Sequence, residues 1–481
     1  MRLNIVFRYI GMVMLLNAAF MLTSAVMSAL NGIDSSFYAL LLSAGLTAVI
    51  GAFPTIFVAA EKQISSKEGY CIVVGAWLMS CVVGMMPFLL WGGEFTLGKA
   101  WFESVSGYTT TGATILNDIE ALPRGLLFWR SCTHWMGGAG VVMFTLMIMP
   151  MLGRSRMMVS SVELSTIAKD DYKYKSGTIM RILLGVYVGL TAACFVCLKV
   201  SGMGWFDSVN HAMSTAATGG FSTKNLSIGF WDNRWIEGVL IVFMFLASIH
   251  FGVIFATLTG RRNNMFRSEI VRYYFFFLVV AVVAVAISTT ANGTFGSFGE
   301  ALRRSAFETV AAASTTGFTS SDPNLWGPFA AAILIFVGIQ CACAGSTGGG
   351  LKADRVYLAA KIVWHQIRQQ QHPNAIIRIK MNGVTQEPST LAFVMLFIVM
   401  YIFLILLGTI FIAAFGYDAL TSFSIAASSV GNVGPAFGQI GGFDNYAALP
   451  GGVRLFSTLL MLLGRLEIFG LVQLFLLKWW K

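Results

Sequence analysis

The stretch T-T-G-A-T at residues 110–114 decides how this chain must fold, because three related stretches follow it. They read T-G-G-F-S at 218–222, T-T-G-F-T at 315–319 and N-V-G-P-A at 432–436. The copies align on one glycine each, namely Gly112, Gly220, Gly317 and Gly434. Successive glycines are about 108, 97 and 117 residues apart. Recurrence at near-constant spacing is typical of internal repeats, so the chain is predicted to contain four versions of one unit.

Composition indicates the environment of these repeats. Hydrophobic residues make up 56% of the chain and charged residues only 11%, with a mean hydropathy of +0.74. A soluble domain carries roughly a quarter charged residues, so this is a polytopic membrane protein. The net charge of +10 does not indicate nucleic-acid binding, because the basic residues lie in short segments between apolar runs. The apolar run after Arg2 and Arg8 is interpreted as a first, retained helix.

Ten segments are apolar and long enough to cross a bilayer, which takes roughly twenty residues. They are 5–30, 37–59, 70–92, 126–150, 178–201, 234–258, 269–291, 327–344, 390–415 and 453–477. Basic residues are concentrated between pairs of spans, as at Lys62 and Lys67 or at Arg261 and Arg262. The positive-inside rule therefore predicts that these loops and both termini are cytoplasmic. The four glycine stretches are then expected on the outer side.

A segment too short to cross the membrane precedes each glycine stretch, at 101–111, 205–219, 305–316 and 420–433. These segments are predicted to be half-helices that enter from outside and return as extended backbone. Such backbone is tolerated at membrane depth only inside protein or beside water, and a pore satisfies four copies at once. The partially negative ends of the half-helices would favour a cation. Small and hydroxyl residues are also ordinary at helix interfaces, but four copies in register favour the pore.

The candidate ion-binding residues are the three residues that end on each glycine. They are Thr110, Thr111 and Gly112; Thr218, Gly219 and Gly220; Thr315, Thr316 and Gly317; and Asn432, Val433 and Gly434. Asn432 stands where the other copies have threonine, so the ring of four cannot be strictly symmetric.

Three copies are preceded by similar strings, F-E-S-V at 102–105, F-D-S-V at 206–209 and F-E-T-V at 307–310. In the second copy four more residues separate the string from its glycine. The acidic residues Glu103, Asp207 and Glu308 are expected near the outer starts of the half-helices. There they either stabilise the helix N-terminus, which is the favoured interpretation, or concentrate cations at the mouth.

With these motifs the whole chain resembles the Trk/Ktr/HKT superfamily of potassium transporters, and within it the bacterial TrkH/TrkG branch. Further matching strings are H-W-M-G-G-A-G at 134–140, A-G-S-T-G-G-G-L-K at 344–352 and G-R-L-E at 464–467. The resemblance implies an all-α membrane fold of four pseudo-symmetric helix, pore-loop, helix repeats around one pore. The repeats are expected at 61–153, 154–262, 263–372 and 373–481, after an N-terminal helix pair at 1–60.

The resemblance also implies partners, a location and a cargo. A homodimer in the bacterial inner membrane is implied, with membrane lipid around it and a cytoplasmic nucleotide-binding regulator resembling TrkA. The polar segment 365–372 is a plausible docking surface for that regulator, although a solvated helix explains it equally well. Potassium is the implied ion, and no organic cofactor is expected. A serine at the position of Gly112 accompanies sodium permeation in plant relatives, so the glycine here implies potassium.

The third repeat contains the candidate gate, since its second span breaks at Gly345, Ser346, Thr347, Gly348, Gly349 and Gly350. Consecutive glycines disfavour a helix by about 1 kcal/mol each. The residues alone leave open a mobile loop below the pore or a simple helix end at the membrane surface. The resemblance implies a loop that blocks the pore. Arg465 lies inside the last span, where an arginine needs a partner, and the resemblance implies that it contacts this loop.

Two function classes remain. The favoured one is potassium uptake through a gated, channel-like pore. The alternative is a potassium symporter coupled to protons or sodium, which should carry ionisable residues near the middle of the membrane. Only Arg465 and Glu467 are obvious candidates for that role. An enzyme is not expected, because the chain has no Walker loop, dinucleotide fingerprint or zincin helix.

Overall fold

The computed structural model describes residues 2–30, 32–59, 64–148, 176–260, 264–374, 378–441 and 443–468. Much of the basic loop that follows the first repeat, including Arg154 and Lys169, lies outside these ranges, as do Lys62, Arg261 and Arg262. The described regular structure is helical apart from one short hairpin, β1 (Lys380–Met381) and β2 (Val384–Thr385). The predicted all-α fold is confirmed.

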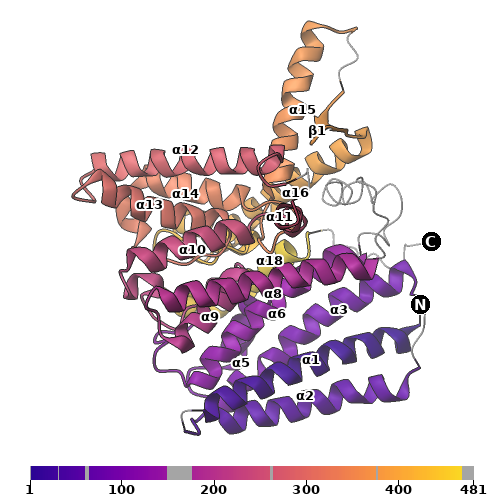
Figure 1. Ribbon diagram of the computed structural model, residues 1–481. Helices are drawn as coiled ribbons and strands as arrows, with labels where there is room; N and C mark the ends of the chain where they lie inside the picture. The colour runs from indigo at the N-terminus through magenta and orange to yellow at the C-terminus, as the bar shows by residue number, and fades with distance from the viewer. Residues whose placement is uncertain are drawn as a thin grey trace.

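An N-terminal helix pair lies along one side of the molecule (Figure 1). It consists of α1 (Leu3–Ala29) and α2 (Phe37–Phe57), which touch closely because glycines face each other. A methyl group on Gly51 would lie 2.7 Å from the Gly11 carbonyl oxygen, and one on Gly11 would lie 2.6 Å from that of Gly51. The start of α1 is joined to the helix that follows this pair, α3 (Ser66–Gly84), by an ion pair of 3.0 Å between Arg2 and Glu68.

The remainder contains four sets of long helix, short helix and second helix. The first set is α3 (Ser66–Gly84) with α4 (Met86–Trp91), α5 (Leu97–Tyr108) and α6 (Arg124–Ile148). The second is α8 (Ser176–Val200), α9 (Trp205–Ala216), α10 (Arg234–Ala247) and α11 (Phe251–Leu258). The third is α12 (Glu269–Ala291), α13 (Phe298–Ala313), α14 (Pro328–Gln340) and α15 (Ala353–Gln371). The fourth is α16 (Pro388–Ala413), α17 (Ala419–Gly431) and α18 (Gly451–Arg465). In the described part of the chain, 3-10 turns lie between the short helix and the helix that follows it in three of the sets: η2 (Ser227–Phe230), η3 (Pro323–Trp326) and η4 (Tyr446–Ala448).

Among the described residues, six helices are long and apolar enough to cross a membrane. The predicted span 269–291 coincides with α12. Large apolar side chains such as Phe57 and Ile410 are more than 70% exposed on these helices, where lipid would cover them. The chain is therefore a multi-pass membrane protein.

Three predicted spans differ from the structure. The span 234–258 is two helices, α10 and α11, bent by 106°. The span 327–344 is helical only to Gln340, and Cys341 then takes a positive φ of 57°. In the span 453–477 the helix α18 ends at Arg465, and Glu467 and Ile468 have positive φ. The rest of that span lies outside the described residues. Hydropathy alone does not detect these breaks, because the residues on both sides of each remain apolar.

The contact between α1 and α2 gives a stability prediction. Gly51→Val should lower the thermal unfolding temperature of the purified protein, because the new side chain overpacks against α1 at a cost of about 1–3 kcal/mol. Gly45→Val is the matched control on the same helix, since no atom lies within 4 Å of the position its Cβ would take. Equal unfolding temperatures for the two variants would contradict the close packing of this pair.

Candidate functional site

The four short helices α5, α9, α13 and α17 end with the same backbone turn. One residue of each turn has a positive φ: Thr110 at 52°, Thr218 at 53°, Thr315 at 59° and Asn432 at 53°. The glycine two residues later also has a positive φ: Gly112 at 81°, Gly220 at 88°, Gly317 at 70° and Gly434 at 101°. The left-handed region disfavours β-branched threonine and suits asparagine. Asn432 therefore fits the shared turn, and its difference in sequence does not change the backbone.

A shared hydrogen bond fixes each turn. The residue before each glycine donates its N–H to a carbonyl five residues earlier in the short helix. The pairs are Thr111 with Ser106 at 2.9 Å, Gly219 with Ser214 at 2.8 Å, Thr316 with Ala311 at 3.0 Å and Val433 with Ser428 at 3.0 Å. The four stretches thus present their backbone in the same way although their sequences differ.

The four glycines, which we call the glycine ring, each contact the backbone just before the next glycine in sequence order. A Cβ atom on any of them would overlap the carbonyl oxygen of the residue that precedes the next glycine. Gly112 faces Gly219, Gly220 faces Thr316, Gly317 faces Val433, and Gly434 faces Thr111. The cycle therefore runs from the first repeat to the fourth and back. One cavity is lined by all four glycines, so four backbone segments meet around a single opening. We call it the outer cavity, after the side on which the sequence predicts the glycine stretches.

Buried polar side chains hold the back of the glycine ring. The Asn432 amide donates to the Thr111 hydroxyl and to the Met461 carbonyl, both at 3.0 Å, and so links the fourth repeat to the first. In the third repeat the hydroxyls of Ser314 and Thr316 lie 2.7 Å apart. All of these side chains are buried. The hydroxyl groups of the stretches therefore form buried hydrogen bonds that hold the backbone of the ring in place.

Glycines of two second helices allow them to touch the ends of the short helices. A Cβ on Gly137 of α6 would overlap the carbonyl of Tyr108, and one on Gly464 of α18 would overlap that of Val430. Tyr108 and Val430 occupy matching positions, two residues before the residue with positive φ. The strings around residues 134–140 and 464–467 are thus close-packing elements at the glycine ring.

The acidic residues are not all where the sequence predicted. Asp207 lies in the first turn of α9, as expected. Glu103 lies in the middle of α5 and Glu308 near the C-terminal end of α13, so a helix N-terminus does not explain them. Their carboxylates accept hydrogen bonds from residues beyond the ring glycines, Glu103 from the Ile115 N–H at 3.1 Å and Glu308 from the Ser320 N–H at 2.6 Å. They clamp the chain that leaves the ring.

In the second repeat this position belongs to a histidine. His211 lies nine residues before its ring glycine, as Glu103 and Glu308 do, and its Nε2 is 3.0 Å from the Ser222 hydroxyl. Asp207 lies one helical turn earlier and accepts a hydrogen bond from Thr223 at 2.7 Å. The similar F-D-S-V string therefore does not mark the equivalent position, which is set by the distance to the glycine.

The loop between α14 and α15 is buried beside the glycine ring. The Thr347 hydroxyl donates to the Ala216 carbonyl at the end of α9 at 3.0 Å, and the Gly349 N–H donates to the Thr315 hydroxyl at 2.9 Å. Gly349 also packs against the Gly431 carbonyl, because a Cβ there would overlap it. Ser346, Thr347 and Gly348 through Gly350 are buried. The segment thus lies within the protein and contacts the short helices of the second, third and fourth repeats.

Arg465 meets this loop. The residue is 5% exposed, and its guanidinium donates to the Thr347 carbonyl at 2.8 Å and to the Gly137 carbonyl of α6 at 3.4 Å. Lys352, at the end of the loop, donates to the neighbouring Gly348 carbonyl. Two cationic side chains therefore hold adjacent carbonyls of the loop, and sequence analysis identified only one of them.

The break between α10 and α11 is the other support of the loop. The Cys343 N–H donates to the Ser248 carbonyl at 2.9 Å, and the Phe251 N–H donates to the Gly345 carbonyl at 3.2 Å. Gly345 lies against the His250 ring, and a Cβ there would overlap it. The unpaired backbone groups of two broken helices thus satisfy each other, which is required of non-helical backbone inside a membrane protein.

Sequence analysis also missed Arg130. This arginine of α6 is 1% exposed and forms an ion pair with Glu103, with a Nε to Oε1 distance of 2.8 Å. The predicted span 126–150 contains it, so the principle that singled out Arg465 could have found it as well. Arg130 lines the same outer cavity as the glycine ring.

Comparison with known proteins agrees with this architecture. Residues 45–479 match the TrkH family, described as a cation transport protein. The chain is 31% identical over 490 residues to the Trk system potassium uptake protein TrkH of Halomonas elongata, covering 100% of both chains. It is 31% identical over 424 residues to the protein of that name from Escherichia coli K12, covering 88% of this chain and 87% of the relative.

A solved structure has the same fold over the whole length. The crystal structure of the potassium transporter TrkH from Vibrio parahaemolyticus superposes with a TM-score of 0.90 at 27% identity, covering 100% of both chains. The resemblance found in the motifs is therefore confirmed, and it points to transport proteins and not to enzymes. This chain belongs to the TrkH family of cation transport proteins.

Proposed function

We propose that this chain takes up potassium ions through a gated, potassium-selective, channel-like pore whose selectivity filter is the glycine ring. The closed cycle of four backbone stretches around one opening is the observation that carries the proposal. Carbonyl oxygens replace the water shell of an ion in such filters. The ion-binding residues of the proposal are the three that end on each ring glycine. The relatives named above are called potassium uptake proteins, which supports the choice of ion.

The filter is short, and this limits its selectivity. Each repeat contributes one ring glycine, where a dedicated potassium channel has a longer signature with two glycines per strand. Fewer stacked rings of carbonyls mean fewer ordered ion sites. We therefore expect weaker discrimination against rubidium and sodium than in a dedicated potassium channel.

The gate of this proposal is the loop of residues 345–350 together with Arg465. The loop packs against the inner side of three short helices, and the buried guanidinium adds a positive charge on the path of a cation. Opening would withdraw the loop from the carbonyl of Ala216 and the hydroxyl of Thr315. A glycine-rich segment suits this motion, because few side chains have to leave apolar contacts.

Control by a cytoplasmic regulator is part of the proposal. Helix α15 begins directly after the loop and projects, with the β1–β2 hairpin, from the body of the molecule (Figure 1). A regulator resembling TrkA that binds near residues 365–372 could pull the loop through α15. We further propose a homodimer in the bacterial inner membrane with both termini cytoplasmic, and the repeat boundaries given above.

A potassium symporter coupled to protons or sodium is the second candidate. The observation that favours it is a buried carboxylate beside the loop. Asp354 is 8% exposed and accepts a hydrogen bond from the Ala344 N–H at 2.6 Å. A group of this kind could carry a coupling charge.

Flux through purified protein in proteoliposomes distinguishes the two. Uptake of potassium, rubidium and sodium should be measured with an imposed membrane potential and, separately, with an imposed proton or sodium gradient. The channel-like pore predicts potassium flux that follows the membrane potential and the potassium gradient and needs no proton or sodium gradient. Flux that requires a proton or sodium gradient would establish the symporter, and equal potassium and sodium permeability would overturn the potassium-selective filter.

Gly112→Ser should reduce potassium-to-sodium discrimination several-fold, because a side chain there overlaps the Gly219 carbonyl and must push two repeats apart. The measurement is the ratio of potassium to sodium uptake in proteoliposomes. Gly202→Ser is the matched control, since Gly202 has a similar φ of 99° but no atom within 4 Å of its Cβ position. An unchanged ratio in Gly112→Ser would remove Gly112 from the filter.

Arg465→Ala should raise potassium flux several-fold in the absence of a regulator, because it removes both a tether of the loop and a buried positive charge. Deletion of residues 345–350 should act in the same direction. Arg454→Ala, near the other end of α18, is the control and should leave the flux unchanged. The gate would be placed elsewhere if neither Arg465→Ala nor the deletion exceeded the wild-type flux.

A further inference from the structure

Two arginines reach the chain just beyond the glycine ring. We call the residues that follow each ring glycine the outgoing limb of that repeat. Arg130 donates from Nη2 to the Thr114 hydroxyl at 3.3 Å and from Nη1 to the Ser222 carbonyl at 3.2 Å. Thr114 and Ser222 each lie two residues after a ring glycine. One guanidinium therefore spans the outgoing limbs of the first and second repeats.

The charge of Arg130 is matched inside the protein. Glu103, which is fully buried, pairs with its Nε at 2.8 Å and also accepts from the Thr114 hydroxyl. The guanidinium carbon lies 4.0 Å from the centre of the Phe221 ring, the residue after Gly220. A buried arginine is stable only when paired in this way. The pairing also limits the repulsion of cations in the outer cavity that Arg130 lines.

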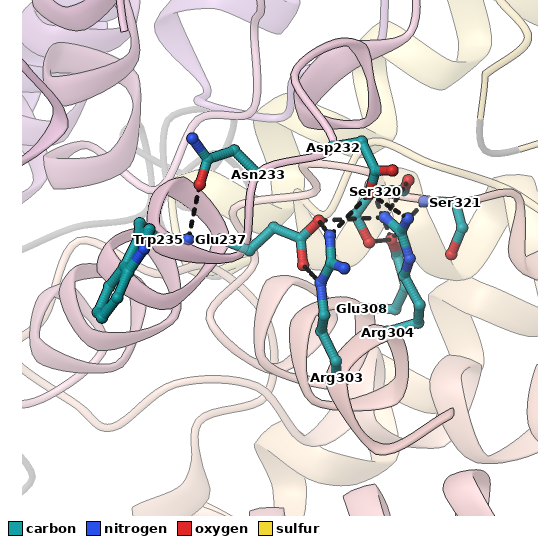
Figure 2. Close-up of polar contacts among 9 residues, drawn as sticks. All are labelled: Asp232, Asn233, Trp235, Glu237, Arg303, Arg304, Glu308, Ser320 and Ser321. Carbon is teal, nitrogen blue, oxygen red and sulfur yellow. Dashed lines mark hydrogen bonds and ion pairs between the residues drawn. The ribbon is translucent and has the colours of Figure 1, made fainter. Parts of the chain in front are cut away.

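Arg304 makes the corresponding contact between the second and third repeats. It donates from Nη1 to the Ser320 carbonyl at 3.0 Å and to Glu237 at 3.1 Å. Glu237 comes from α10 of the second repeat and is 1% exposed. Figure 2 shows Arg304 beside Ser320, whose N–H is held from the other side by Glu308 at 2.6 Å. Both backbone groups of Ser320, its N–H and its carbonyl, are thus held by buried or half-buried side chains.

The neighbouring Arg303 shares the ion pairs of Arg304 but not its contact with the limb. Arg303 binds Glu237 at 2.6 Å and Asp232 at 2.7 Å, as Figure 2 shows. Arg304 binds the same two carboxylates. Among the hydrogen bonds of the described residues, only Arg304 of the two donates to an outgoing limb. The chain therefore supplies its own matched control.

Neutral groups hold the outgoing limb of the fourth repeat. The Tyr446 hydroxyl donates to the Gly434 carbonyl at 2.9 Å, and Ser424 exchanges hydrogen bonds with the Phe437 backbone at 2.9 and 3.0 Å. The Tyr446 N–H also donates to the Thr114 carbonyl at 2.8 Å, which joins the fourth repeat to the outgoing limb of the first. Charged side chains thus hold the outgoing limbs of the first three repeats, and neutral side chains hold that of the fourth.

We propose that Arg130 and Arg304 are positioning residues of the filter and so set its discrimination between potassium and sodium. Arg130 joins the outgoing limbs of the first and second repeats, and Arg304 joins the outgoing limb of the third repeat to α10 of the second. This inference rests on the proposed function of the glycine ring. Its physical basis is the planar guanidinium, which presents several donors in a rigid fork and can bind groups of two repeats at once. A lysine offers one point charge and cannot span the same oxygens.

The test compares Arg304→Gln with Arg303→Gln in full-length protein reconstituted in proteoliposomes. Thermal unfolding and gel filtration first establish that both variants fold. The potassium-to-sodium uptake ratio should fall several-fold in Arg304→Gln and stay at the wild-type value in Arg303→Gln. A ratio unchanged in Arg304→Gln, or lowered equally in both, would overturn the inference, because the second result would assign the effect to the ion-pair network as a whole.

The first arginine provides an independent arm. Arg130→Lys keeps the charge but loses the fork, so it too should lower the ratio several-fold. Glu103→Gln leaves the guanidinium unneutralised beside the outer cavity and should slow potassium uptake more at low than at high ionic strength. A wild-type ratio in Arg130→Lys would contradict the inference even if Arg304→Gln behaved as expected. A wild-type protein that does not prefer potassium would instead refute the proposed function, and the inference with it.

Discussion

The structure depends on the close backbone contact at the glycine ring, which leaves no room for a side chain. Four carbonyl oxygens occupy the space where four Cβ atoms would stand. Backbones can approach this closely only at glycine, and a residue with positive φ lies two positions before each ring glycine, in three repeats a threonine. Conformations of this kind cost of order 1–3 kcal/mol each and persist only where the surroundings over-determine them. The surrounding structure supplies that restraint in layers.

Each layer acts on a different part of the turn. The short helices fix the approach through the hydrogen bond to Ser106 and its equivalents. The glycines of α6 and α18 let second helices press on the helix ends. Beyond the ring, Glu103, Glu308 and the two arginines hold the outgoing limbs. Charged groups at membrane depth are expensive unless paired, so their presence here marks where the backbone requires the strongest restraint.

Much of this could be predicted from the sequence, because the determinants are local. Glycine at a fixed period, apolar runs of spanning length and a lone arginine are visible without a structure. The bend at 248–250 is not visible, because its backbone groups are satisfied by Cys343 and Gly345, about a hundred residues away. The roles of the acidic residues were misjudged for a related reason. Similar strings suggested that Asp207 matches Glu103, whereas the distance to the ring glycine makes His211 the structural counterpart.

The departures from fourfold symmetry lie mainly around the loop of residues 345–350, and the proposed single pore would explain this. In the proposed pore only one segment can occupy the axis, so one repeat would provide the loop and the others would receive it. The third repeat provides residues 345–350, the second leaves its helix broken to pair with them, and the fourth adds Arg465, which reaches the first through Gly137. The loop is held chiefly by hydrogen bonds, each worth a net of about 1 kcal/mol, and by little apolar side-chain area. In the proposed gate, a closed state held in this way would be stable at rest and would yield to a modest mechanical pull on α15.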